Sequence, residues 1–216
     1  MRTATVLLLL LPAAQAEAQE SLETKLVITH EGRETGREEF SLRQGRGRGA
    51  PGSTLIAVAR YPATNPLLKL AATLERTPES ALAKFQLDVQ GPNGTTVILA
   101  AGSGARLIIR TVAKGSEAGR ELPGGPDVVL LDDAVYSLYT AVVDLATPSG
   151  KSLTGVFPRT SRRASFVARR DAGGENGATR VTLSGEINGT VLTDSRGRLQ
   201  RLEFPGSGIL VTRAPD

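Results

Sequence analysis

The chain holds a single histidine, His30, and no cysteine, and this limits nucleophilic chemistry. A serine nucleophile needs a base within hydrogen-bond reach, and histidine is the commonest base. His30 falls at the end of an expected first strand, and the sequence contains no G-x-S-x-G elbow. We therefore expect no serine hydrolase, and thiol catalysis and cysteine-ligated zinc are excluded. The sequence predicts that the protein is not an enzyme.

Asp132 and Asp133 are adjacent carboxylates, which can bind a divalent cation. They also precede a helical pattern, where a carboxylate accepts hydrogen bonds from the first backbone N–H groups, and we favour this capping role. Gly150-Lys151-Ser152 resembles the end of a phosphate-binding loop, but Leu145 occupies the required glycine position and the expected helix precedes the motif. We predict no metal site and no cofactor.

Two tyrosines and three aliphatic residues mark a candidate ligand cavity within the segment VVLLDDAVYSLYTAVVDLA, residues 128–146. Apolar residues three and four apart form one stripe of a helix, which we place at about 132–146. The tyrosines lie three apart, so their rings can point inward while their hydroxyls stand at a cavity mouth. The candidate cavity residues are Val135, Tyr136, Leu138, Tyr139 and Val142. Simple core packing is the alternative role for them.

The densest basic cluster lies between Arg159 and Arg170. Within it, Arg163 and Arg169 share the parity of one expected strand, so their side chains project from the same face. That face could bind an anionic headgroup or a partner protein. A solvated strand surface that discourages aggregation is the alternative interpretation.

Most of the remaining chain shows the two-residue alternation of β-strands. In residues 84–90, for example, Phe85, Leu87 and Val89 alternate with polar residues, and Pro92-Asn93-Gly94 follows as a tight turn. Residues 114–127, rich in Gly and Pro, are expected to form a loop. The predicted fold is mainly β: a large curved antiparallel sheet, half-barrel or barrel-like, with one embedded α-helix.

The N-terminal residues resemble a secretory signal peptide, with Arg2, an apolar run at 6–11 and small residues at Ala16 and Ala18. We expect cleavage after Ala16 or Ala18, which leaves residues 19–216 as one β domain with one helix. The apolar run is shorter than the roughly 20 residues that a membrane-spanning helix needs. We therefore expect no transmembrane segment and a periplasmic or secreted protein.

The net charge of +4 is concentrated in residues 147–216, so this part of the surface could meet an anionic partner. The segment QGRGRG at 44–49 has the Arg-Gly units of some RNA-binding proteins, but it lacks their aromatic residues. Because an export signal precedes it, we expect no nucleic-acid partner.

The order of an export signal, antiparallel strands, one helix and further strands resembles periplasmic half-barrel proteins of the lipoprotein-localisation type. Residues 126–145, PDVVLLDDAVYSLYTAVVDL, and 189–213, GTVLTDSRGRLQRLEFPGSGILVTR, are also similar to bacterial exported domains of unknown function. The resemblance implies a curved sheet over an apolar cavity. It supplies no catalytic residues.

These observations leave two main hypotheses for the function. In the first, the protein is a non-enzymatic periplasmic carrier that shelters a lipid or other apolar molecule between the sheet and the helix. In the second, it is a structural module of the cell envelope with a filled core and a basic surface for an envelope protein partner. An enzyme with a carboxylate-based mechanism is a third hypothesis.

Overall fold

The computed structural model describes residues 22–45, 52–171 and 177–215. The expected signal peptide, residues 1–18, lies outside these residues. In the described part, the strands are β1 (Leu22–His30), β2 (Arg33–Gln44), β3 (Ser53–Tyr61), β4 (Leu68–Arg76), β5 (Leu82–Gly91), β6 (Gly94–Ser103), β7 (Arg106–Ala113), β8 (Ser116–Pro123), β9 (Val128–Leu130), β10 (Lys151–Phe157), β11 (Arg162–Arg170), β12 (Thr179–Gly185), β13 (Gly189–Thr193), β14 (Leu199–Phe204) and β15 (Ile209–Arg213). The helical segments are η1 (Tyr136–Tyr139), α1 (Thr140–Leu145) and η3 (Pro205–Ser207).

All the strands form one 15-stranded sheet in the order β8 to β1, then β15 down to β9. Neighbours in the sheet are antiparallel, except that β9 runs parallel to β10. The two edge strands, β8 and β9, are not hydrogen-bonded to each other, so the sheet is open. The predicted class, a large curved antiparallel sheet with one helix, is confirmed.

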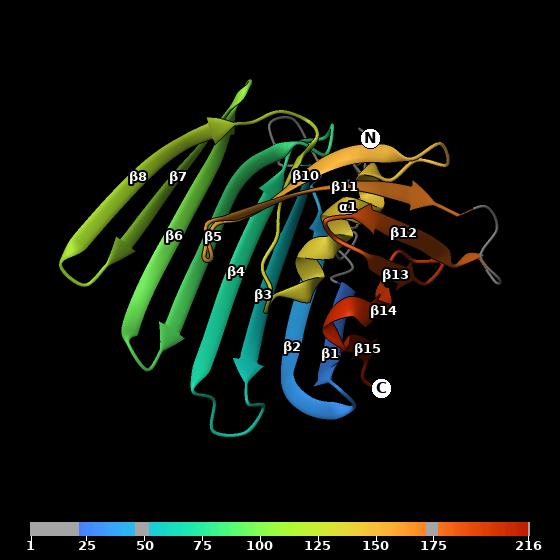
Figure 1. Ribbon diagram of the computed structural model, residues 1–216, viewed down its shortest axis with the longest axis horizontal. Coiled ribbons are helices and arrows are strands. Elements are labelled where there is room, and N and C mark those ends of the chain that lie inside the picture. The colour runs from blue at the N-terminus through green and yellow to red at the C-terminus, as the bar shows by residue number, and fades with distance from the viewer. Residues whose placement is uncertain (1–21, 46–51, 172–176, 216) are drawn as a thin grey trace, which may run out of the picture.

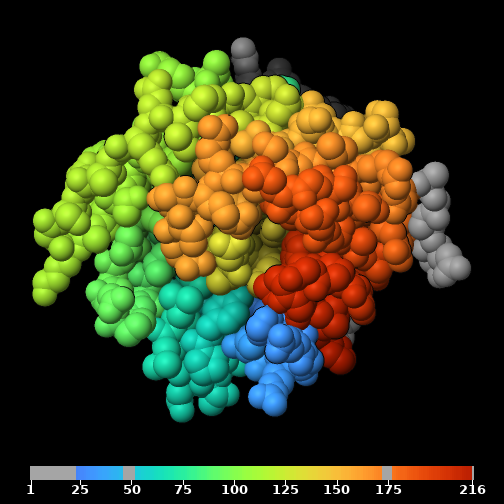
Figure 2. Space-filling model, in the orientation of Figure 1, coloured from blue at the N-terminus to red at the C-terminus, as the bar shows by residue number. Residues whose placement is uncertain are grey.

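The sheet folds over the helix. Figure 1 shows β1 to β8 as a long curved surface, with β10 to β15 turned across one part of it and α1 between the two. Strand β9 lies against β5. This contact brings the two halves of the sheet together on the side away from β1. In Figure 2 only a small yellow area, the helical region, is visible between the orange and red strands.

Alternation along the strands produces this single core. In β3, Leu55, Ala57 and Ala59 face inward and are buried, whereas Ile56 on the outer face is 44% exposed. Residues that are paired on neighbouring strands point to the same face of the sheet, and buried Leu74 of β4, for example, is opposite buried Leu55 of β3. The inner faces of both halves therefore meet around the helix.

The helix is shorter than we expected. It begins with a 3₁₀ turn at Tyr136 and ends at Leu145, so the prediction of a helix from 132 to 146 is wrong at its start. Asp132 accepts a hydrogen bond from the Ala134 N–H group and makes a tight turn with Val135, and this delays the helix. Because the sheet encloses residues 136–143, these are all buried rather than along one stripe, and Asp144 near the end of the helix is exposed.

Neither aspartate caps the helix. The carboxylate of Glu38, on the inner face of β2, accepts the N–H groups of Tyr136 at 2.7 Å and Ser137 at 3.0 Å. At the other end of the helix, the Arg170 side chain donates a hydrogen bond to the Val143 carbonyl. Arg76 forms an ion pair with the carboxylate of Asp144, the residue after Val143. A carboxyl group from β2 therefore lies at the start of the helix, and a guanidinium group from β11 lies at its end.

The segment 114–127 is not a loop throughout, because residues 116–123 form β8. Its alternation was not evident in the sequence, since Gly119 and Pro123 interrupt a polar stretch. The strand pairs with β7 along its whole length and leaves its other side as a sheet edge. Within the described ranges, no helix is long and apolar enough to cross a membrane.

Candidate ligand pocket

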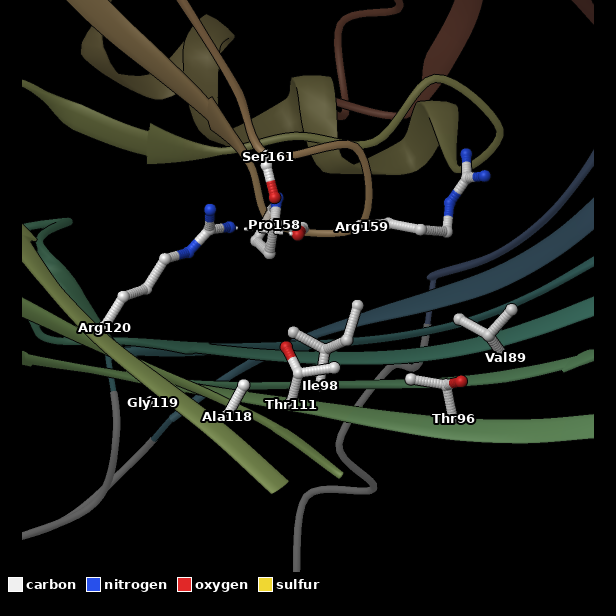
Figure 3. Close-up of a pocket in the computed structure, with 10 residues that line it drawn as sticks. All are labelled: Val89, Thr96, Ile98, Thr111, Ala118, Gly119, Arg120, Pro158, Arg159 and Ser161. Carbon is white, nitrogen blue, oxygen red and sulfur yellow. Dashed lines mark hydrogen bonds between the residues drawn. The ribbon is translucent and has the colours of Figure 1, made fainter. Parts of the chain in front are cut away.

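A pocket of about 400 Å³ lies on the inner face of the sheet, where β5 to β8 extend beyond the helix. Its floor comes from these four strands, and its roof is the turn 158–161 that joins β10 to β11. Figure 3 shows the floor side chains pointing up toward this turn, with open space between them. The pocket exists because the folded-over half of the sheet does not reach the β8 edge.

Strand register places the floor residues side by side. Val89 is opposite Thr96 in the β5–β6 pair, and Ile98 is opposite Thr111 in the β6–β7 pair. Thr111 in turn is opposite Ala118 on β8. Directly opposed residues share a face of the sheet, so these side chains form one continuous surface. It is mostly apolar, with two threonine hydroxyls.

The roof turn is fixed by Arg159. Its Nε and Nη2 atoms donate to the two carboxylate oxygens of Asp132, each at 2.8 Å. Asp132 is 1% exposed and also accepts the Ala134 N–H group. The bond to Asp132 raises the pKa of Arg159 above its usual value, so the guanidinium group stays charged. This bidentate pair attaches the turn to the chain just before the helix.

Arg120 supplies the charge of the pocket. It projects from β8 toward the turn, where its Nη2 atom donates to the Pro158 carbonyl at 3.0 Å (Figure 3). None of the described carboxylates is within ion-pair distance of Arg120, whereas Arg159 is neutralised by Asp132. The pocket therefore combines an apolar floor with one uncompensated guanidinium group.

Three of the residues we predicted to line a cavity lie deep in the core. Val135, Leu138 and Val142 have no exposed surface, and none of them lines the pocket under the turn. Tyr136 and Tyr139 are also buried, at 4% exposed each, but both line a different pocket on the other side of the Arg159 turn. The structure thus brings the two tyrosines together and separates them from the three aliphatic residues.

Arg163 and Arg169 share a face of β11, as their spacing indicated, and this face is the outer one. Both are exposed, and the inward positions of the strand, such as Phe166, are buried. Arg169 lies 3.6 Å from the carboxylate of Asp171. Neither arginine lines the pocket under the turn.

Sequence reasoning did not identify Arg120 or the floor residues. Arg120 lies in the segment 114–127, which we expected to be a loop. The floor residues come together only through the pairing of β5 to β8, which the sequence does not show. Arg159 stood out within the basic cluster, but no local pattern connects it to Asp132, 27 positions away. His30 is exposed at the end of β1, and nowhere among the described residues do three or more His, Asp or Glu side chains form a group that could hold a metal ion.

Comparison with known proteins gives a likeness of fold. No protein-family model matches the chain, and no curated protein matches its sequence. The crystal structure of a DUF1089 family protein from Pseudomonas aeruginosa is similar, with 12% sequence identity, a TM-score of 0.44, and coverage of 92% of this chain and 97% of that one. The expected resemblance to lipoprotein carriers is not confirmed by these comparisons.

Proposed function

We propose that this protein is an exported, non-enzymatic binding protein for an anionic amphiphile, a molecule with an acyl chain and a carboxylate or phosphate group. The observation that carries the proposal is the pocket under the 158–161 turn, in which an apolar floor faces the unpaired guanidinium of Arg120. In this arrangement the acyl chain lies along the floor and the anionic group binds Arg120.

The size and lining of the pocket support this class of ligand. Pockets of roughly 300 to 1,000 Å³ hold typical small ligands, and each buried CH₂ group contributes about 0.8 kcal/mol. Arginine binds carboxylate and phosphate groups with two parallel hydrogen bonds. Arg120 donates one hydrogen bond, from Nη2 to the Pro158 carbonyl, and its other N–H groups can bind such an anion.

Isothermal calorimetry with sodium decanoate and 1-decanol tests the proposal, because the two probes share a chain and differ in charge. We expect saturable decanoate binding to residues 19–216 and a lower affinity for decanol. Replacing Ala118 with Phe fills the pocket from an exposed position on the edge strand, so it should abolish binding of both probes. Glu117→Phe is the matched control, since the neighbouring residue faces the outer side and should leave both affinities unchanged.

Arg120→Gln separates the charge from the shape of the pocket. Loss of a charged hydrogen-bond donor costs about 1.5 to 3 kcal/mol, so we expect decanoate affinity to fall roughly 10- to 100-fold while decanol affinity stays the same. Arg110→Gln is the control, because Arg110 lies on the outer face and pairs with Glu117. Equal affinity of the wild type and Ala118→Phe for decanoate would contradict the proposal.

The alternative function, an envelope interaction module, is favoured by one observation. On the outer face of β11, Arg163 and Arg169 flank Val167, which is 38% exposed. Such a face could contact an acidic envelope partner, and the association would weaken as salt increases. Crosslinking that recovers such a partner, together with no decanoate binding, would favour this function over the first.

A further inference from the structure

A second pocket lies on the opposite side of the roof turn, beside the helix. Its volume is about 310 Å³, and its walls include Tyr136, Tyr139 and Phe204, with Ile187 and Ile209 nearby. The ring centroids of Tyr139 and Phe204 are 5.1 Å apart, and those of Tyr136 and Phe204 are 6.2 Å apart. The 3₁₀ segment η1 and strand β14 thus hold an aromatic cluster at the surface of this pocket.

The charged groups of this pocket already have partners within the protein. Arg162 pairs with Asp133, and its guanidinium lies 3.5 Å from the centre of the Phe157 ring. The carboxylate of Glu186 accepts the backbone N–H group of Ser165. A charged ligand would have to displace one of these contacts, so the pocket favours an uncharged molecule.

The neutral polar groups are also paired, with one exception. Tyr136 donates its hydroxyl to the Asp133 carbonyl, and the Asn188 side chain makes two bonds with the Gly185 backbone. Ser207 donates to a backbone carbonyl in its own turn. The side chain of Tyr139 is 4% exposed, and its hydroxyl, which keeps contact with solvent, makes no hydrogen bond to any described residue.

That free hydroxyl is a permanent donor. Burial away from water is the main reason that the pKa of Tyr139 is raised, with the nearby carboxylate of Asp133 acting in the same direction. The phenol therefore keeps its proton throughout the physiological pH range. A ligand that accepts a hydrogen bond from this hydroxyl gains about 0.5 to 1.5 kcal/mol.

We propose that this second pocket binds a small uncharged aromatic molecule that carries a hydrogen-bond acceptor, with its ring against Tyr136, Tyr139 and Phe204 and its acceptor on the Tyr139 hydroxyl. Tilted contacts between aromatic rings favour such a ligand, and the size of the pocket suits one or two fused rings. This site is independent of the amphiphile pocket, because it shares none of the residues that line that pocket.

Proton–nitrogen NMR titration with 1-indanone and indane tests this inference. The two probes have the same ring system, and indanone alone carries an acceptor oxygen. We expect indanone to shift the amide signals of Ile187, Ser207 and Tyr139 saturably in wild-type protein. Indane should bind at the same place with lower affinity.

Tyr139→Phe removes the free hydroxyl and keeps the ring. We expect it to weaken indanone binding about 3- to 10-fold, in line with one neutral hydrogen bond, and to leave indane binding unchanged. The matched control is Tyr136→Phe, which removes a hydroxyl that is already bonded within the protein, and it should alter indanone affinity less than about twofold.

Three results would overturn the inference. The first is the absence of saturable shifts with either probe. The second is an equal loss of affinity for indanone and indane in Tyr139→Phe, because that would show a change of packing rather than of hydrogen bonding. The third is a larger effect of Tyr136→Phe than of Tyr139→Phe on indanone binding.

Discussion

Glu38 is the residue on which the interior of the protein depends most. It has no exposed surface, and its two carboxylate oxygens are the caps of the helix N-terminus. Burial away from water raises the pKa of Glu38 from 4.5 to about 7, although the bonds from Tyr136 and Ser137 act in the opposite direction. A carboxylate with this pKa changes its charge near neutral pH.

The raised pKa predicts a specific dependence of stability on pH. The folded protein binds this proton more tightly than the unfolded chain does, so Glu38 contributes stability that is complete below about pH 4.5 and is lost as the pH rises through 7. The difference is on the order of 3 kcal/mol. Urea unfolding of wild-type protein and Glu38→Gln, followed by circular dichroism at several pH values, measures it.

We expect Glu38→Gln to be less stable than wild type at pH 5, because an amide cannot accept hydrogen bonds at both of its terminal atoms. Its free energy of unfolding should also lack the decrease between pH 5 and 7.5. Glu39→Gln is the control, since Glu39 is exposed on the outer face and lies 3.7 Å from Arg60. An identical pH dependence in wild type and Glu38→Gln would contradict this account of the cap.

At the scale of elements, the roof turn 158–161 depends on the pair of Arg159 and Asp132. Asp132→Asn removes the charge and leaves Arg159 with a weaker partner, so we expect a loss of about 1 to 3 kcal/mol in the free energy of unfolding. The adjacent Asp133→Asn should cost less than about 1 kcal/mol, because Asp133 is 46% exposed in its pair with Arg162. Thermal unfolding of both variants gives the comparison, and equal losses would show that the pair does not fix the turn.

The sequence was sufficient for most strands because their apolar residues alternate. The alternation at residues 84–90, for example, lies within the observed bounds of β5, Leu82–Gly91. The helix start was wrong because its cap comes from Glu38, 98 positions before Tyr136, and no local pattern contains that information. β8 was missed because an edge strand next to solvent needs few apolar residues.

At the scale of the whole molecule, one open sheet builds two different environments. Where its halves overlap, the inner faces and the helix fill a core dominated by Leu, Val, Ile and Ala. Where β5 to β8 extend past the overlap, the same inner face becomes the floor of a pocket. Val135, Leu138 and Val142, which we predicted to line a cavity, have no exposed surface, because the sheet encloses this part of the helix.

This division explains which part of the candidate site was predictable. The pattern of inward residues followed from alternation, but the position at which the second half of the sheet ends is set by long-range pairing between β1 and β15 and between β9 and β10. Arg120 faces a pocket rather than solvent only as a result of that pairing. Tyr136 and Tyr139 were recognisable as a pair because they lie three residues apart on one helix.

The most direct test of the proposed function is to locate bound decanoate by proton–nitrogen NMR of residues 19–216. Binding in the pocket under the turn should shift the backbone amide signals of Thr96, Ile98, Thr111 and Ala118 together and saturably, with no shifts in Ala118→Phe. Absence of saturable shifts, or shifts confined to the outer face of the sheet, would contradict the account.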